Sequence, residues 1–285
     1  MTAGKKRRKT IPLLCGLAVF AGMAFLAGCG KSSSKKTEAP AIKPGQKIVT
    51  VSLSGGVELK LARVGAGSFE MSAGDGTNDS DEVAHPAVLK RDFYIGKTEV
   101  TQAQWKAVMG TNPSKFRGKD LPVENVSWND AMEFCESLND AGNAPDGWIF
   151  TLPTETQWEY AARGGEDGTV GRKYSGDDRV EKVAWYYENS RSRTRPVGRK
   201  KANELGLHDM CGNVWEWCLD DWRKKSDSLT AEFTKVDYQK GSSRVIRGGS
   251  WFGSARRCRI ANRSHSSPDY RDDRLGFRVA LVPVE

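Results

Sequence analysis

The feature that most limits how this chain can fold is the long segment after Gly165, in which no helical periodicity persists. Gly, Asn, Asp, Ser and Pro are spread through about 80 residues, with short candidate strands near 245–246 and 277–282. Irregular segments of this length are uncommon in a compact domain, so specific contacts must hold the loops. Nine tryptophans are available for this, and residues 244–278 contain nine arginines and no lysine. Because a guanidinium is a planar fork, we predict that most of these arginines tie loops to carboxylates and carbonyls.

The segment before Gly165 has regular patterns. Apolar residues alternate at 49–53 and 57–61 around a Gly-Gly pair, which predicts a β-hairpin. Thr101, Ser127 and Thr154 each stand three residues before a Gln or Asp, which predicts three helices that begin with capping boxes. The tryptophans on the first and third of these helices are expected in the core.

The N-terminus has the pattern of a bacterial lipoprotein. Five basic residues at 5–9 precede an apolar run that ends in Leu26-Ala27-Gly28-Cys29, and small residues before a cysteine are typical of a lipobox. We predict a lipoprotein signal peptide at 1–28, a lipid on Cys29, and a flexible polar tether at 29–48. Glycine rather than aspartate follows Cys29, so we expect a lipid-anchored protein of the cell envelope, at the outer membrane. The alternative is an ordinary signal peptide with a chance cysteine.

The net charge of +8 does not indicate a nucleic-acid partner. Five of the positive charges lie in the predicted signal peptide, which has no acid, so the rest of the chain is near +3. Four cysteines remain in the body, Cys135, Cys211, Cys218 and Cys258, and they allow three disulfide pairings. No two of them form a CxxC pair, and the three histidines are scattered, which argues against a zinc site.

A series of motifs in order resembles the formylglycine-generating-enzyme (sulfatase-modifying factor) family over about residues 55–282. The motifs are GSFEM at 67–71, TEVT at 98–101, PVENVSW at 122–128, LPTE at 152–155, WEYAARGG at 158–165, GLHDMCGNVWEW at 206–217, RGGSW at 247–251 and LGFR at 275–278. The resemblance implies an α+β fold related to C-type lectins for residues 49–285, with little regular secondary structure.

The resemblance also bears on catalysis. The family's oxidases hold copper(I) with two cysteines, separated by four residues, after the Gly-Gly-Ser motif, and soft thiolates suit that ion. This chain has only Cys258 there, beside an Arg-x-Ala-x-Arg sequence where the family has a non-catalytic position. We therefore expect no copper site, and Cys258 is the one candidate for a catalytic residue. An oxidase that makes formylglycine on a sulfatase, or a related protein-modifying oxidase, is the alternative.

The family's calcium site is carried over more directly. By position its ligands are Asp209, the backbone carbonyls of Gly212 and Val214, and Glu216, and hard oxygens on a tight loop suit calcium. The alternative is that Glu216 pairs with an arginine and the loop folds without a metal. The family fold also brings the segment around Cys258 beside the Trp-Glu-Trp motif, which implies a Cys218–Cys258 disulfide.

The resemblance finally implies a ligand-binding face. Retroelement-diversified lipoproteins with this fold bind ligands between the Gly-Gly-Ser-Trp and Gly-Phe-Arg motifs. The ligand-binding residues expected here are Trp251 of the first motif and the residues that would face outward after it: Phe252, Arg256, Arg257, Ile260, Asn262, Ser264, His265, Asp269, Tyr270, Asp272 and Asp273. We therefore predict a non-catalytic module that binds a ligand or an exported protein at the envelope. A solvated loop with no partner, and a structural role in an envelope assembly, are the other interpretations.

Overall fold

The computed structural model describes residues 41–72, 82–168, 171–223 and 243–284. The predicted signal peptide, the predicted lipidation site Cys29 and most of the predicted tether lie outside these ranges. No helix in the described ranges has both the length and the apolar composition needed to cross a bilayer. Short helices and three separate sheets make up the described part, which confirms the predicted α+β class.

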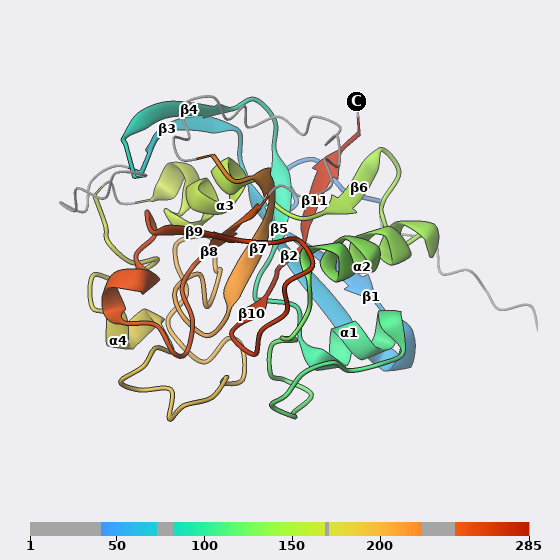
Figure 1. Cartoon of the computed structure of the whole chain (residues 1–285). Helices are drawn as coiled ribbons and strands as arrows, with labels where there is room; N and C mark the ends of the chain where they lie inside the picture. The colour runs from blue at the N-terminus through green and yellow to red at the C-terminus, as the bar shows by residue number, and fades with distance from the viewer. Residues whose placement is uncertain (1–40, 73–81, 169–170, 224–242, 285) are drawn as a thin grey trace, which may run out of the picture. The chain divides into compact units, whose positions relative to one another are not determined.

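The largest sheet has the strand order β1-β2-β5-β11-β6, and all its pairs are antiparallel. Its strands are β1 (Ile48–Ser52), β2 (Glu58–Val64), β5 (Phe93–Gly96), β11 (Ala280–Pro283) and β6 (Trp148–Thr151). Strands β1 and β2 form the predicted hairpin, with the short 3-10 turn η1 (Ser54–Gly56) between them. Strand β11 lies between β5 and β6, so the last described residues complete a sheet that the first ones begin (Figure 1).

Three helices begin as predicted. They are α1 (Gln102–Met109), α2 (Trp128–Asp140) and α3 (Glu155–Ala162), and each has a complete capping box. Helices α1 and α2 pack on each other, and α2 also packs on β6 (Figure 1). Between them Trp105 stacks on Phe134 at 5.6 Å, and both rings meet Phe277 edge to face.

The second half of the chain has fewer regular elements. A four-stranded sheet has the order β10-β7-β8-β9, formed by β10 (Leu275–Gly276), β7 (Trp215–Asp221), β8 (Arg244–Arg247) and β9 (Arg263–Ser266). Strands β3 (Gly67–Met71) and β4 (His85–Leu89) form a separate pair. The rest is loop, apart from α4 (Val180–Val183), η2 (Gly165–Asp167) and η3 (Ala255–Cys258). Helix α3 contacts β3, β7 and β8 and so links these parts.

Tryptophan indoles hold several loops from inside. The ring N–H of Trp128 donates to the carbonyl of Cys218 at 2.9 Å, and that of Trp217 donates to the carbonyl of Val126 at 3.1 Å. Trp105 and Trp158 are buried, as predicted. A buried indole contributes apolar area and places one donor, so it can fix a loop that has no backbone ladder of its own.

Candidate functional site

Buried arginines position the segment 244–278, as the sequence predicted. Seven of its nine arginines pair with a carboxylate. At the centre, Arg263 donates to both oxygens of Glu155, at 2.6 and 2.8 Å, and Arg247 donates to Glu155 at 3.1 Å and to Glu159 at 2.5 Å. All four side chains are fully buried. Glu155 and Glu159 stand one turn apart on α3, so this helix anchors strands β8 and β9.

A second buried pair lies under the predicted calcium loop. Arg278 donates to both oxygens of Glu216, at 2.6 and 2.7 Å, and the ring N–H of Trp158 donates to Glu216 at 2.7 Å. The alternative in which Glu216 pairs with an arginine is therefore what the structure shows. The Glu216 carboxylate already has three charged or polar donors, and its charge is balanced by Arg278.

Two other carboxyl groups beside this pair are not fully hydrogen-bonded. Both oxygens of Glu99 and one oxygen of Asp209 are buried without a hydrogen bond, while the other Asp209 oxygen accepts from the amide of Gly198 at 2.6 Å. Burial raises the pKa of Glu99 well above its ordinary value, and the charges of Asp209 and Glu216 raise it further. Burial likewise raises the pKa of Asp209 to about 6. No pattern in the sequence indicates that Glu99 is buried beside this pair, because it stands in a strand-like motif between threonine and valine.

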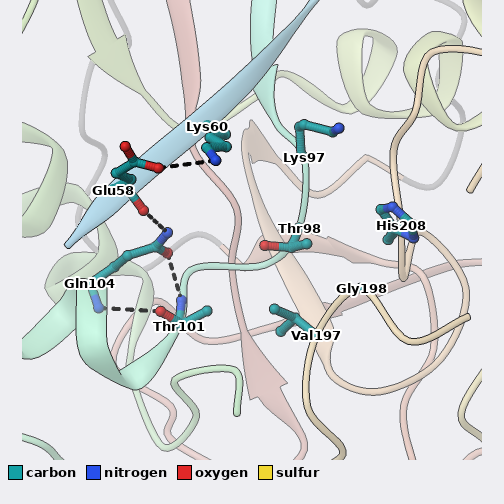
Figure 2. A pocket seen from close by; sticks show the side chains of 9 residues that line it. All are labelled: Glu58, Lys60, Lys97, Thr98, Thr101, Gln104, Val197, Gly198 and His208. Atoms are coloured by element: carbon teal, nitrogen blue, oxygen red, sulfur yellow. Dashed lines mark hydrogen bonds and ion pairs between the residues drawn. The ribbon is translucent and has the colours of Figure 1, made fainter. Parts of the chain in front are cut away.

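A pocket of about 330 Å³ opens next to these acids (Figure 2). Thr98 and His208, the chain neighbours of Glu99 and Asp209, line it together with Gly198. Its two lysines differ, because Lys60 pairs with Glu58 at 3.0 Å (Figure 2) whereas Lys97 has no ion-pair partner among the described residues. Among the residues that the structure describes, no group of three or more His, Cys, Asp or Glu side chains is arranged to hold a metal.

The predicted outward face is only partly outward. Six of its residues are exposed: Phe252, Arg256, Arg257, His265, Asp269 and Tyr270. Four are half-buried: Asn262, Ser264, Asp272 and Asp273. The outward prediction is wrong for Ile260, which is buried, and Trp251, expected as a ligand contact, is buried as well.

Packing explains why both side chains are buried. Ile260 belongs to the core, and its carbonyl accepts a hydrogen bond from Arg247. The indole of Trp251 donates to the carbonyl of Asp273 at 3.0 Å, so this ring joins the two ends of the segment instead of facing solvent.

The expected face is also not one patch. His265 lies on β9 and packs on Trp222 with the rings 4.5 Å apart. Asn262 donates to Glu82, which also pairs with Arg259. Tyr270 and Asp272 share a hydrogen bond, and Asp269 accepts one from Asn129 on α2.

The structure instead gathers four rings from three separate segments of the chain. Phe116, Tyr187, Trp251 and Phe252 form what we call the aromatic strip: Phe252 meets Trp251 at 5.5 Å and Tyr187 at 5.9 Å, and Trp251 meets Phe116 at 5.6 Å, all edge to face. The exposed fractions of Tyr187 and Phe252 are 62% and 51%. Phe116 and Tyr187 come from loops that no sequence periodicity relates to the RGGSW motif, so only the fold reveals them.

The cysteines differ from expectation. All four cysteines in the described ranges are free and buried, so the predicted Cys218–Cys258 disulfide is wrong. The neighbours that act on the Cys258 thiol include Cys211, whereas Cys218 on β7 is next to Glu155 and Asp220. Burial raises the pKa of Cys258 far above its ordinary value and that of Cys211 to about 12, so both are thiols at neutral pH.

Comparisons with known proteins agree with these features. The model of a family described as the sulfatase-modifying factor enzyme 1-like domain matches residues 58–282. The chaperone protein LppX of Paenibacillus barcinonensis is 38% identical over 220 residues, which cover 61% of this chain and 74% of that one. The formylglycine-generating enzyme of Streptomyces coelicolor is 36% identical over 201 residues, 64% of this chain and 59% of the enzyme. The chain thus spans less than two thirds of that enzyme's length.

Among solved structures, Treponema denticola variable protein 1 superimposes with a TM-score of 0.71 and 34% identity, over 84% of this chain and 100% of that one. The similarity covers the regular first half and the loop-rich second half together.

Proposed function

This chain belongs to the sulfatase-modifying factor enzyme 1-like family, and from that premise we propose that it is a non-catalytic binding module of the cell envelope. The observation that carries the proposal is a contrast within one segment. The thiol that follows the Gly-Gly-Ser motif is buried, whereas two rings of the aromatic strip beside that motif, Tyr187 and Phe252, are open to solvent.

The buried thiol argues against oxidase chemistry. Copper(I) is bound by thiolates, and a thiolate forms readily only where the pKa of the cysteine is low. Burial holds the pKa of Cys258 high, and residues 248–278 contain no second cysteine. Its neighbour Cys211 is buried and equally difficult to ionise.

The aromatic strip supports the binding role. Exposed Tyr and Phe next to Arg is the composition of contact hot spots in protein interfaces. Arg274 lies over the ring of Phe252 at 5.5 Å, and Arg193 lies over the ring of Phe116 at 5.6 Å. Because one relative is named a chaperone protein, we favour an exported polypeptide as the partner.

The membrane anchor is part of the same proposal. A lipid on Cys29 followed by the polar tether would hold the domain at the envelope, with the outer membrane as the destination. Metabolic labelling with a palmitate analogue tests this: the wild-type chain should be labelled and Cys29→Ser should not. Equal labelling of both would contradict the anchor.

The function itself is tested in two assays on the full chain. Copper(I) titration and a formylglycine assay on a Cys-x-Pro-x-Arg peptide should give neither stoichiometric copper nor product. Binding of a peptide with Phe, Tyr and Leu before four glutamines should weaken about tenfold in Phe252→Ala, since a buried aromatic contact contributes a few kcal/mol at most. Val88→Ala, which removes an equally exposed apolar side chain on β4, is the control and should leave binding unchanged. Turnover with bound copper would overturn the proposal.

We also propose a calcium ion at the 209–216 loop, with one change from the expected ligand set. Asp209 and the carbonyls of Gly212 and Val214 would hold it, and the unpartnered Glu99 would supply the second negative charge, because Glu216 is occupied by Arg278. Glu99 has no hydrogen-bond donor and Asp209 has one, on a single oxygen, so two such buried carboxylates are costly unless a cation or a proton neutralises them. Calcium, and not magnesium, should then raise the melting temperature of the wild type but not of Asp209→Asn. No calcium effect, together with a more stable Glu99→Gln, would show that protons do this instead.

A further inference from the structure

A second surface feature lies beside the aromatic strip and is strongly basic. Two loops, at 117–121 and 193–196, line a pocket of about 380 Å³, which we call the basic groove. Four cationic side chains line it, Arg117, Lys119, Arg193 and Arg195, against one acid, Asp120. In the part of the chain that the structure describes, none of the four has an ion-pair partner.

The backbone of the groove is fixed. The buried amide of Asn213 accepts from the N–H of Arg195 at 2.9 Å and donates to its carbonyl at 3.2 Å. The N–H of Val197 donates to the carbonyl of Asp120 at 3.0 Å and ties the two loops together. Arg117 and Arg195 also donate to backbone carbonyls of their own loops. The guanidinium groups of Arg117 and Arg195 are therefore held in place before any ligand arrives, which lowers the entropy cost of binding.

The like charges in the groove are not compensated. Burial lowers the pKa of Arg195, and the neighbouring Arg191 and Arg193 lower it further. The cations that flank the aromatic strip differ, because Lys115 pairs with Asp273 and Arg274 pairs with Asp272. Lys115 and Arg274 are thus compensated whereas the cations of the groove are not, and an anion bound in the groove would relieve their repulsion.

The groove and the aromatic strip are continuous. Arg193 lines the groove and also lies over Phe116, which is the end ring of the strip. A ligand that spans both must carry apolar groups at one end and negative charge at the other. A polyphosphate chain carries charge along its whole length and would place it over the strip, where the cations are already paired.

We propose that the basic groove binds the carboxylates of an acidic segment in a polypeptide whose neighbouring apolar side chains contact the aromatic strip. This inference rests on the proposed binding function and names the chemical class of the partner. Arginine forks match carboxylates in a bidentate geometry, and the groove has room for a few acidic side chains.

The test uses the detergent-solubilised full chain and three synthetic peptides. One has Phe, Tyr and Leu before four glutamates, the second has four glutamines in their place, and the third has glycines before four glutamates. At low salt the first should bind about tenfold tighter than the second, which corresponds to ~1.4 kcal/mol. The preference should fall below about threefold in the Arg117→Gln/Arg193→Gln double variant. It should persist in Lys43→Gln/Lys47→Gln, which loses the same charge from an exposed segment outside the groove.

The possible outcomes separate the two proposals. Equal binding of the glutamate and glutamine peptides, with both sensitive to Phe252→Ala, would overturn the acidic partner and leave the binding function standing. Binding of only the glycine-glutamate peptide would overturn both. Tighter binding of an oligonucleotide or of phosphatidylglycerol vesicles, lost in the same groove variant, would show that the groove takes phosphates and would also overturn the inference.

Discussion

Arginines do opposite things in two regions of this protein. In 244–278 they are mostly paired, and the buried ones link strands or loops to carboxylates on other elements. In the basic groove Arg117 and Arg193 are exposed and Arg195 is half-buried, and none of the three pairs with an acid. The difference lies in the neighbours: α3 and β7 present Glu155, Glu159 and Glu216 to the first region, whereas the loops of the groove present only Asp120. Buried ion pairs thus hold the loop-rich half together, whereas the unpaired cations of the groove are available to a partner.

The largest effect should come from breaking a buried pair. Arg247→Met leaves Glu159 with Arg163 alone and Glu155 with Arg263 alone, and removing one partner of a buried ion pair costs about 3–5 kcal/mol. Urea unfolding followed by tryptophan fluorescence measures it. The matched control is Arg271→Met, which removes an exposed pair with Asp130 from the same segment and should cost less than about 1 kcal/mol. Equal losses of unfolding free energy in the two variants would show that the buried and exposed pairs do not differ in their contribution to stability.

A smaller, pH-dependent effect should come from Glu124, a buried acid next to the aromatic strip. One of its oxygens accepts from the N–H of Phe116 at 2.8 Å and the other has no partner. Burial raises its pKa to about 7. The folded state therefore holds a proton that the unfolded chain releases near pH 4.5. The contribution of Glu124 to the free energy of unfolding is thus highest at low pH and falls as pH rises towards 7.

The size of this loss should be about 2 kcal/mol between pH 5 and pH 7.5. Glu124→Gln resembles the protonated acid and should unfold with a flatter pH dependence, becoming more stable than the wild type above pH 7. Unfolding in urea at several pH values measures the difference, in which the contribution of Asp220 cancels because both proteins contain it. Parallel pH curves would show that Glu124 ionises freely in the folded state.

The smallest effect should come from the groove. Arg193→Gln combined with Arg195→Gln should change the free energy of unfolding by less than about 0.5 kcal/mol, because neither side chain has an ion-pair partner to lose. Relief of like-charge repulsion could make the change slightly favourable. Thermal unfolding with and without 0.5 M salt checks this. A loss above about 2 kcal/mol would mean that the groove is structural and does not differ from the buried region.

Sequence patterns predicted local features well and inside-outside placement poorly. The capping boxes at Thr101, Ser127 and Thr154, the first hairpin and the pairing of the arginines depend on residue type and short spacing, and the structure confirms them. Ile260 was placed outward because an irregular segment has no period from which to judge its direction.

The features missed by the sequence depend on distant contacts. The aromatic strip joins residues more than 60 positions apart, and the raised pKa of Glu99 depends in part on Asp209 and Glu216 from another part of the chain. The proposed disulfide failed for a similar reason, since proximity of segments did not fix which thiols face each other.

The position of β11 has a consequence for how the domain assembles. This strand comes from residues 280–283, yet both of its edges are paired, to β5 on one side and β6 on the other. The two parts of that sheet therefore cannot join until almost the whole domain is available, and contacts of such high sequence separation form slowly. During synthesis the aromatic core around Trp105 and Phe277 would stay open, which makes the growing chain itself a client for chaperones until its final strand is available.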